Sequence, residues 1–390
     1  MRSIVSYPRR VLQVRRLAVH LVIASLLVSC GDDAEPSEPG AVGKPGPYVP
    51  AHTTVSILDA ERELTVEVWY PGQGDQAQGE PAANFERDPE RRSALADLLQ
   101  AATPGCPTLT TQASRDAPAL STLGAMPLVV FSHCLNCGRY SAFSLAERLA
   151  SHGMIVVAPD HAGPMPFADG QEGEPLDAEQ LERRVADLRF LISASLDGSL
   201  FALSSALDGL SVDAERIGAF GHSFGSATAG RLAQLDPRVG AAAGLAAPMA
   251  SFLFPSVAMD AIDAPLLLVL AQEDNSITEI GNDLLRDNFA DAVSPVWLLE
   301  LADAGHWSIS DLCGLTPSFT AGCGAGERHS RGQEGEAFSY LPVQQGIEVA
   351  QRYLATFFLA HLNADNDALS ELQSPRIEAG VSLSQRSAKN

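Results

Sequence analysis

Short apolar runs alternate with stretches of helical periodicity through most of the chain after residue 60. In the first run, Leu64, Val66, Val68 and Tyr70 alternate with polar residues, which is the period of a half-buried strand. The later runs are continuous and apolar, at residues 128–132, 154–158, 216–222, 240–245, 265–271 and 295–301. Continuous apolar strands are typical of a parallel sheet that is covered on both faces.

Amphipathic segments separate these strands. Helices are expected at 144–152, 177–206, 227–234 and 343–362, and Gly153 follows the first of them as a stop. The alternation of short strands with helices predicts an α/β fold, with a mostly parallel central sheet and helices on both of its faces.

The segments outside this pattern differ in composition. Residues 30–50 are rich in Asp, Glu, Pro and Gly and offer little to bury, so we expect a disordered tether before a domain at 51–365. Residues 72–126 read as an irregular insertion in that domain, with a helical piece near 93–102. The polar residues 366–390 are expected to form a loose tail.

The first 29 residues contain five arginines and no acid, and an apolar run extends from Leu17 to Val28. This pattern indicates an export signal and is short for a membrane span. The run ends in Leu27-Val28-Ser29-Cys30, which resembles the lipobox of bacterial lipoproteins, in which the cysteine carries the lipid. The resemblance implies a membrane-anchored lipoprotein of the cell envelope. An ordinary cleaved signal, or an uncleaved anchor with an incidental cysteine, is the alternative.

The chain is acidic, with a formal net charge of −22, and loss of the five arginines of the signal makes it more negative still. Nucleic acid is therefore not an expected partner, because its phosphates would be repelled. Anionic lipid headgroups would be repelled as well, so attachment to a membrane would depend on acyl chains at Cys30.

Five cysteines follow Cys30, at Cys106, Cys134, Cys137, Cys313 and Cys323. An exported chain favours disulfides, and an odd number leaves one thiol over. Cys313–Cys323 is the expected bridge, because it would close a short Gly-rich loop. A zinc site formed by Cys134 and Cys137 with that second pair is the less favoured alternative, so no metal is expected.

The strand at 216–222 leads into a G-x-S-x-G pattern, Gly221-His222-Ser223-Phe224-Gly225. A strand that turns sharply into a helix needs residues without Cβ beside the serine, so that neighbouring backbone can pass, and the turn exposes the serine hydroxyl. Ser223 is therefore the candidate nucleophile. The alternative is a serine that only caps a helix.

Two more polar residues follow apolar strands, Asp274 after 265–271 and His306 after 295–301. Reactive groups of an open α/β sheet gather at the carboxyl ends of its strands, and the order Ser, Asp, His is that of α/β-hydrolases. A serine hydroxyl needs an imidazole to take its proton, and the imidazole needs a carboxylate to fix its tautomer. Asp274 could instead cap a helix and His306 could be a packed loop residue. Glu273 and Asp303 are the nearest rivals for the acid.

Acyl transfer also needs two backbone N–H donors for the developing oxyanion. Phe224, which follows the nucleophile, would supply one. Leu135, in the loop after the strand at 128–132, is the candidate for the other.

Five motifs in the chain carry a resemblance to a known family. They are Phe131-Ser-His-Cys-Leu135, Val157-Ala-Pro-Asp-His-Ala-Gly163, Arg184-Val-Ala-Asp-Leu-Arg-Phe-Leu191, Gly221-His-Ser-Phe-Gly225 and Ala304-Gly-His-Trp-Ser308. Together they resemble the bacterial dienelactone-hydrolase-like esterases, which are related to plasma platelet-activating-factor acetylhydrolase, and the likeness extends from about residue 46 to residue 362. It implies an α/β-hydrolase fold and a serine esterase without metal or cofactor. It also implies a Ser223, Asp274 and His306 triad with an oxyanion hole from Leu135 and Phe224.

Two departures from the family pattern bear on the site. Relatives carry Gly where this chain has Cys134, and a Cβ is costly there if the position needs a positive φ. The animal acetylhydrolase takes its acid from the end of the strand after the nucleophile helix, where residues 244–248 offer no carboxylate. This absence favours Asp274.

The sequence therefore predicts a serine hydrolase that cleaves carboxylic esters, whether short-chain, lipid-like or polyester, through an acyl-Ser223 intermediate. An amide or lactone hydrolase with the same triad is one alternative, and a catalytically silent binding lipoprotein is another. Residues 251–259 could form a lid or an acyl-binding wall over the site, or pack into the core.

Overall fold

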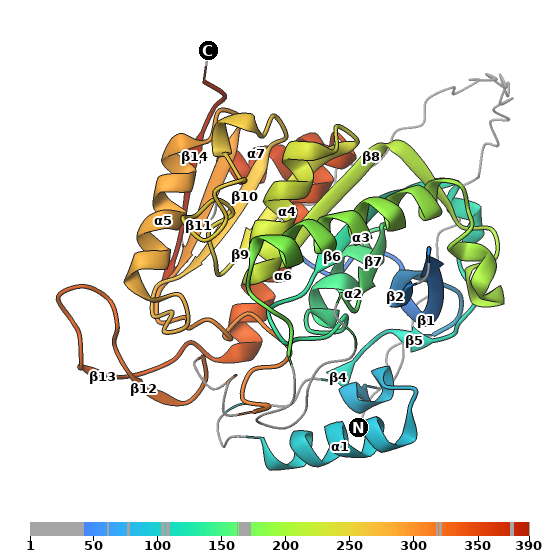
Figure 1. The fold of residues 1–390 in the computed structure, drawn as a ribbon, viewed down its shortest axis with the longest axis horizontal. Coiled ribbons are helices and arrows are strands. Elements are labelled where there is room, and N and C mark those ends of the chain that lie inside the picture. Colours follow the sequence, from blue (N-terminus) through green and yellow to red (C-terminus); the bar gives the residue numbers. More distant parts are fainter. Residues whose placement is uncertain are drawn as a thin grey trace, which may run out of the picture. The chain divides into compact units, whose positions relative to one another are not determined.

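Ten strands form one sheet in the computed structural model of this protein (Figure 1). The structure describes residues 43–389 apart from 61, 76–78, 103–105, 107–109, 162, 164–172, 317–318, 320–321 and 375–377. The predicted export signal, Cys30 and the first part of the predicted tether lie outside the described residues.

The centre of the sheet is parallel. Its spatial order is β14, β11, β10, β9, β8, β6, β7, β2, β1 and β5. The strands of the parallel centre are β6 (Ala125–Ser132), β7 (Ile155–Pro159), β8 (Ser211–His222), β9 (Val239–Leu245), β10 (Leu266–Ala271) and β11 (Val296–Leu301). The strands that join antiparallel at the two sides are β1 (Val49–Asp59), β2 (Arg62–Gly72) and β14 (Val381–Arg386). The short β5 (Ser114–Arg115) pairs in parallel with β1.

Helices cover both faces of this sheet (Figure 1). One buried apolar cluster contains Val129 and Phe131 of β6 with side chains of α2 (Phe143–Ser151) and α6 (Val343–Leu362). The other cluster contains Leu128 and Val130 with side chains of α3 (Ala178–Leu196), α4 (Phe224–Leu235) and α5 (Thr278–Asp291). Alternate residues of one strand thus enter opposite cores. The predicted α/β-hydrolase fold, with a mostly parallel sheet between two helical layers, is confirmed.

Smaller elements decorate this framework. The insertion at 72–126 contains β3 (Glu80–Pro81), the 3-10 turns Ala82–Phe85 and Ser121–Leu123, α1 (Pro89–Ala101) and β4 (Thr110–Thr111). The helical piece expected near 93–102 is therefore the second part of α1. Later small elements are the 3-10 turns Phe201–Leu203, Ser205–Leu207 and Met259–Ala261, the hairpin of β12 (Ala325–Glu327) and β13 (Ala337–Ser339), and α7 (Asn366–Gln373).

Two predicted boundaries are wrong at the N-terminal and middle parts of the chain. The described end of the predicted tether is docked, because the Gly46 N–H donates to Ser151 Oγ (2.9 Å), and β1 already begins at Val49. The helix expected at 177–206 ends at Leu196. Gly198 follows with a φ of 79°, a left-handed conformation that favours glycine and ends the helix.

The predicted loose tail is also wrong. Residues 366–373 form α7, whose Ala368 and Leu372 are buried against the core. Residues 381–386 form β14, which pairs along the whole of β11, from Val296 opposite Arg386 to Leu301 opposite Val381. The C-terminal segment therefore completes one side of the sheet.

A carboxylate ties the loop after β11 to the start of α2. Asp311 Oδ2 accepts hydrogen bonds from the Ser144 N–H (2.9 Å) and from Ser144 Oγ (3.0 Å). Its Oδ1 is buried and has no partner among the described residues. Burial raises the pKa of Asp311 to about 8, although the bonds from Ser144 oppose the shift. The folded protein therefore keeps Asp311 protonated at a pH where the unfolded chain has lost that proton.

The sign of the resulting pH dependence follows from this difference. Because the folded pKa lies above the unfolded one, Asp311 lowers the stability as the pH rises from about 4 to about 8. In Asp311→Asn the neutral amide keeps an oxygen that can accept from Ser144. We therefore expect the free energy of unfolding to change less with pH, and at pH 8 to exceed that of wild type by on the order of 1–3 kcal/mol. Urea unfolding at several pH values measures this, with the exposed Asp208→Asn as control. An unchanged slope in Asp311→Asn would contradict the assignment.

Candidate active site

Ser223 lies at the turn between β8 and α4, with a φ of 56° and a ψ of −120°. This conformation is strained for a residue with a Cβ. A Cβ on Gly221 would lie 1.9 Å from the Gly225 carbonyl oxygen, and a Cβ on Gly225 would lie 1.9 Å from the Ser132 carbonyl oxygen. The two glycines therefore permit the turn. The Ser223 side chain stays partly exposed at the carboxyl edge of the sheet.

His306 and Asp274 meet at the same edge. Asp274 follows β10 and His306 follows β11, and these strands are neighbours. His306 Nδ1 lies 2.7 Å from Asp274 Oδ2, and both residues are buried. A carboxylate only accepts, so Nδ1 carries the proton and Nε2 is the basic nitrogen. Asp274 Oδ1 also accepts from the N–H groups of Ser276 (2.8 Å) and Ile277 (3.0 Å), so the residue is both the partner of the histidine and the acceptor that holds the turn before α5.

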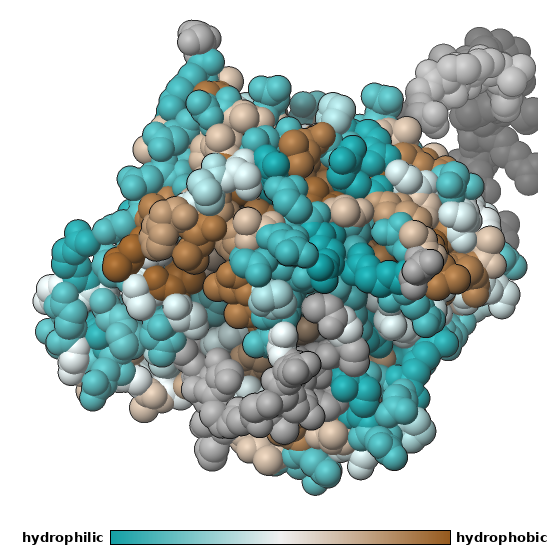
Figure 2. All heavy atoms as spheres, viewed as in Figure 1, coloured by the Kyte–Doolittle hydropathy of each residue, from teal (hydrophilic) through white to brown (hydrophobic). Residues whose placement is uncertain are grey.

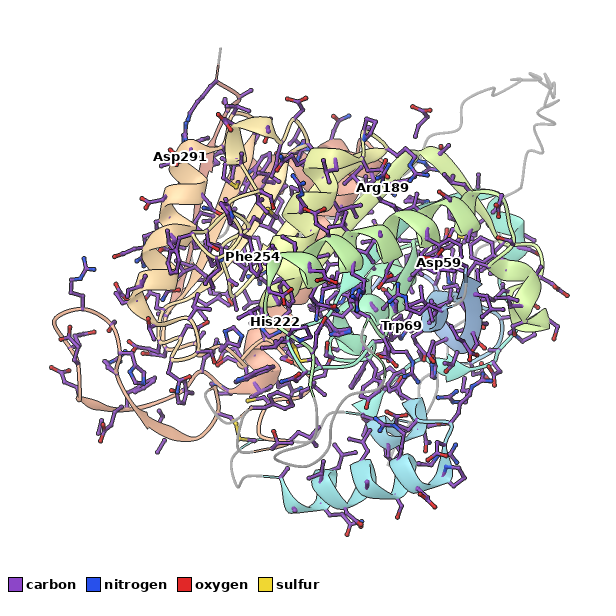
Figure 3. All side chains as sticks on the ribbon, in the orientation of Figure 1. Asp59, Trp69, Arg189, His222, Phe254 and Asp291 are labelled. Carbon is purple, nitrogen blue, oxygen red and sulfur yellow. A yellow bond between two sulfur atoms is a disulfide. The ribbon has the colours of Figure 1, made fainter. Side chains whose placement is uncertain are left out.

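The residue before Ser223 joins the histidine loop to the serine turn. His222 Nε2 donates to the His306 carbonyl oxygen (3.0 Å), and the two ring centroids are 4.9 Å apart. Burial, together with the neighbouring His306, lowers the pKa of His222 to about 3, so its ring stays neutral. Figure 3 labels His222 where β8 ends, close to the start of α4. Ser223 and His306 are thereby held on adjoining segments.

The two rival carboxylates are paired elsewhere. Glu273 accepts from the His329 N–H (2.7 Å) and from the Ser330 hydroxyl (2.8 Å), and it pairs with Arg328 (2.8 Å). Burial alone would raise the pKa of Glu273, but these hydrogen bonds outweigh it and hold the pKa below its usual value. Asp303 pairs with the same Arg328 (2.7 Å). Both acids therefore hold the segment at 328–330.

The loop that carries Leu135 leaves the sheet beside the serine turn. β6 pairs with β8 so that Ser132 lies opposite Gly221, and residues 133–138 begin there. The residue with a positive φ in this loop is Asn136 (56°), not Cys134, so the Cβ of Cys134 is accommodated. Cys134 forms a disulfide with Cys137 inside the loop. Phe224 is the first residue of α4, where the backbone N–H has no partner within the helix.

A buried polar network lies behind the site, and the sequence patterns do not predict it. His161 Nδ1 lies 2.8 Å from Asp187 Oδ2, and His161 Nε2 lies 3.0 Å from Ser132 Oγ. These three residues are at most 2% exposed, so they are closed to substrate and instead hold the end of β6 to α3. Arg184, one turn before Asp187, is fully buried too. The sequence feature that points to this network is the pair of charges on the otherwise apolar face of α3.

Residues 251–259 contribute to both the core and the surface. Phe254 is buried and its ring stacks on that of Phe224, with centroids 5.1 Å apart. Phe252 is 71% exposed and Leu253 is 54% exposed, and Ile280 at the start of α5 is 65% exposed. Figure 2 shows hydrophobic atoms gathered over this part of the surface, where α5 and the segment after β9 lie. An apolar surface therefore adjoins the residue that follows Ser223.

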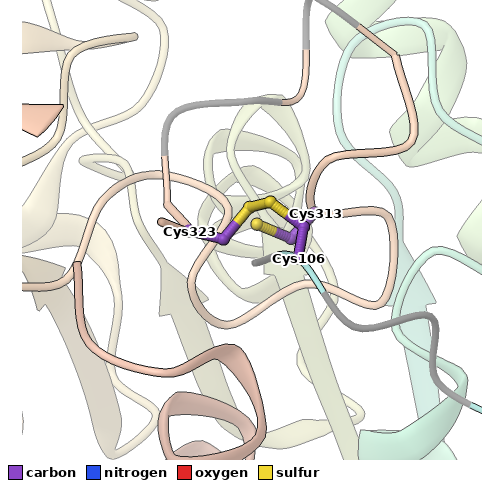
Figure 4. Close-up of side chains that lie close together, drawn as sticks. All are labelled: Cys106, Cys313 and Cys323. Carbon is purple, nitrogen blue, oxygen red and sulfur yellow. A yellow bond between two sulfur atoms is a disulfide. The ribbon is translucent and has the colours of Figure 1, made fainter. Parts of the chain in front are cut away.

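The cysteines pair differently from the prediction. Cys106 forms a disulfide with Cys323, and Cys313 is a free, buried thiol. The expected Cys313–Cys323 bridge is therefore wrong. The reason lies in the fold, because the insertion brings Cys106 to the loop after β11, and the three sulfur atoms lie within 4.8 Å of one another (Figure 4). Spacing along the chain could not reveal this third sulfur.

The alternative zinc site is not formed by the proposed residues. It required free thiols from both pairs, whereas Cys134 and Cys137 are bonded to each other and Cys323 is bonded to Cys106.

Among the described residues, no helix has the length and apolar character needed to cross a membrane.

Comparison with known proteins agrees with the fold. The model of the dienelactone hydrolase family matches residues 126–308, and the model of the platelet-activating factor acetylhydrolase isoform II family matches residues 46–186. Among solved structures, the chain is similar to a ferulic acid esterase from Streptomyces cinnamoneus, with 25% sequence identity and a TM-score of 0.62. The match covers 88% of this chain and 98% of that one. The protein is therefore an α/β-hydrolase esterase that resembles the dienelactone hydrolase and platelet-activating factor acetylhydrolase families.

Proposed function

We propose that this esterase works through an acyl intermediate on Ser223, with His306 as general base and Asp274 as the orienting acid. The observation that carries the proposal is the 2.7 Å contact between His306 Nδ1 and Asp274 Oδ2 beside the strained serine turn. It fixes the tautomer in which Nε2 can accept the proton of a serine hydroxyl.

The proposed reaction has two stages, acylation of Ser223 and hydrolysis of the acyl-enzyme. Ser223 Oγ attacks the ester carbonyl while His306 Nε2 takes its proton, and the N–H groups of Phe224 and Leu135 stabilise the oxyanion. The tetrahedral adduct collapses, and His306 returns the proton to the departing alcohol. Water then attacks the acyl-Ser223 ester by the same route in reverse and releases the acid.

The surface beside the serine favours substrates with an apolar part. Phe252, Leu253 and Ile280 are exposed, and Phe254 packs on the residue that follows Ser223. Exposed apolar groups gathered at one place are typical of a binding surface. We therefore assign a substrate ester that carries a medium-length aliphatic or an aromatic group.

A substrate panel tests this function. We expect hydrolysis of p-nitrophenyl esters whose acyl chains have about four to eight carbons, and of a methyl ester of a hydroxycinnamic acid. An amide and a lactone are tested alongside them as alternative substrates. A fluorophosphonate probe should label Ser223, as peptide mapping would show. Faster turnover of the amide or lactone would assign the same triad to that reaction. Failure of both hydrolysis and labelling would leave a binding protein.

We also propose that the protein is a lipoprotein anchored through Cys30 to a membrane of the cell envelope. The support is the basic and then apolar segment before Cys30 in a chain whose net charge is −22. Acyl chains contribute about 0.8 kcal/mol for each buried CH₂, while an acidic surface gives no attraction to anionic lipids.

Replacing the anchor residue tests this localisation. In Cys30→Ser the protein should move from the membrane pellet to the soluble fraction of the producing bacterium, because no acyl chain can be attached. Fractionation with immunoblotting measures this, and Cys313→Ser is the matched control. Retention of the Cys30→Ser protein in the pellet would show that another anchor is present.

A further inference from the structure

Arg184 lies fully buried between the segments that carry the two expected oxyanion donors. Its guanidinium donates to the carbonyl oxygens of His133 and Cys134, the latter at 3.2 Å. Its Cζ also lies 4.2 Å from the centroid of the Phe224 ring. One buried cation therefore touches the residue after the nucleophile and the backbone just before Leu135.

The contact with Cys134 reaches the donor peptide itself. The carbonyl of Cys134 and the N–H of Leu135 belong to one peptide group, and the described part of the chain contains no cis peptide bond. In a trans peptide the C=O and the N–H point in opposite directions. A group that holds the oxygen on one side therefore sets the direction of the N–H on the other. Hydrogen bonds to the oxygen also polarise the peptide, which strengthens its N–H as a donor.

His133 is a second donor to the same oxygen. Its Nε2 accepts from the His161 N–H (3.2 Å), so its proton is on Nδ1, which lies 2.7 Å from the Cys134 oxygen. Burial and the nearby Arg184 lower the pKa of His133 to about 4, so the ring is neutral at pH 7. Arg184 Nη2 lies 3.4 Å from this Nδ1 because both donors converge on one carbonyl, which also accepts from the Cys137 N–H (3.2 Å).

Glu174 holds the guanidinium in this position. Its carboxylate contacts Nε and Nη2 of Arg184, and its backbone N–H donates to Asn136 Oδ1 (2.8 Å). The pair is thus tied to the Leu135 loop at a second point. A guanidinium can serve two carbonyls and a carboxylate at once through its planar fork of donors, which an ammonium cannot do.

We infer that Arg184 is a positioning residue that aims and polarises the Cys134–Leu135 peptide as an oxyanion donor and braces Phe224, the other donor. The inference rests on the proposed function, because it assigns a role within the same reaction. Such preorganised donors act when charge develops on the substrate oxygen, so their loss lowers kcat more than it changes KM.

Arg184→Lys is the principal test. It keeps a cation for Glu174 but cannot reach both carbonyls, so kcat per active site should fall by about 10²-fold while KM changes by less than about threefold. Active sites are counted by complete fluorophosphonate labelling, which separates slow turnover from a loss of folded protein. The inhibition constant of a trifluoromethyl ketone, which forms an oxyanion on the serine, should rise by the same factor as kcat/KM falls.

A matched control isolates the contact from the general cost of changing a buried arginine. Arg139 is equally buried and pairs with Glu67 (3.1 Å) and Asp160 (2.8 Å), and its guanidinium makes no bond to the Cys134 or His133 carbonyl in the described structure. Arg139→Lys should lower the melting temperature and leave kcat per labelled site within about threefold. In Arg184→Ala, guanidinium ion at tens of millimolar should restore part of the lost kcat, and it should do nothing for wild type.

Three outcomes would overturn this role of Arg184. If Arg184→Lys keeps kcat per labelled site, or if Arg139→Lys loses as much, Arg184 does not position the donor peptide. If Arg184→Lys raises KM but leaves the inhibition constant of the trifluoromethyl ketone unchanged, Arg184 acts in substrate binding instead. An unlabelled, inactive wild type would remove the proposed function and this inference together, and so is distinguishable from the other outcomes.

Discussion

Ser223→Ala should abolish ester hydrolysis, with a loss in kcat on the order of 10⁵–10⁶-fold, the scale seen when the nucleophile of such a triad is removed. The melting temperature should remain nearly unchanged, because the partly exposed Ser223 side chain makes no hydrogen bond to a described residue. Alanine also keeps the Cβ that the strained turn already accommodates. Initial rates on a p-nitrophenyl ester and a thermal melt measure the two quantities.

Ser226 gives a matched control three residues further along α4. Its hydroxyl donates to the Ala247 carbonyl oxygen (2.7 Å) and is fully buried. Ser226→Ala should therefore cost about 1 kcal/mol of stability and leave kcat nearly intact. Full activity in Ser223→Ala, or complete inactivation in Ser226→Ala with Ser223→Ala unaffected, would refute the assignment of the nucleophile.

Asp274→Asn should keep the fold and lose about 10³–10⁴ in kcat, the size of the effect when such a carboxylate is neutralised. The asparagine oxygen can still accept from Ser276 and Ile277, which preserves the turn before α5. Its amide group would instead donate to His306 Nδ1, so the ring proton would move to Nε2. A protonated Nε2 cannot take the serine proton. The pH profile of kcat and a thermal melt, measured side by side, separate this effect from unfolding.

The two rival carboxylates provide the controls. Glu273→Gln and Asp303→Asn should each cost less than about tenfold in kcat, because neither touches the imidazole and both pair with Arg328. They should instead lower the stability of the segment at 328–330. If Asp303→Asn were the crippling change and Asp274→Asn the mild one, the acid would be misassigned even though the esterase reaction stood.

The parallel centre of the sheet could be predicted because its strands contain continuous apolar runs. Buried parallel strands leave this trace in any sequence, since both of their faces must be apolar. β14 leaves no such trace, because only alternate residues such as Val381 and Leu383 face the core and the others are exposed. A strand at the side of a sheet therefore looks like a polar tail until its partner is known.

The candidate site was partly open to prediction for a similar reason. Ser223, Asp274 and His306 follow apolar strands, so parallel pairing brings them to one edge whatever the loops do. The roles of Arg184 and Asp187 depend on which loop α3 packs against, and the Cys106–Cys323 bridge depends on the path of the insertion. Contacts between segments far apart in the chain are set by tertiary packing, which no local pattern records.

The position of β14 has a practical consequence for handling the protein. A version cut after residue 365, where composition alone suggests that the domain ends, would keep the pairing of β11 with β10 but would leave the opposite side of β11, six residues long, without its partner β14. Such an open edge is a template for another chain, so the shortened protein would tend to aggregate although every residue of the candidate site is retained. The last strand of the chain thus protects this edge of the sheet. An affinity tag should be added after it rather than replace it.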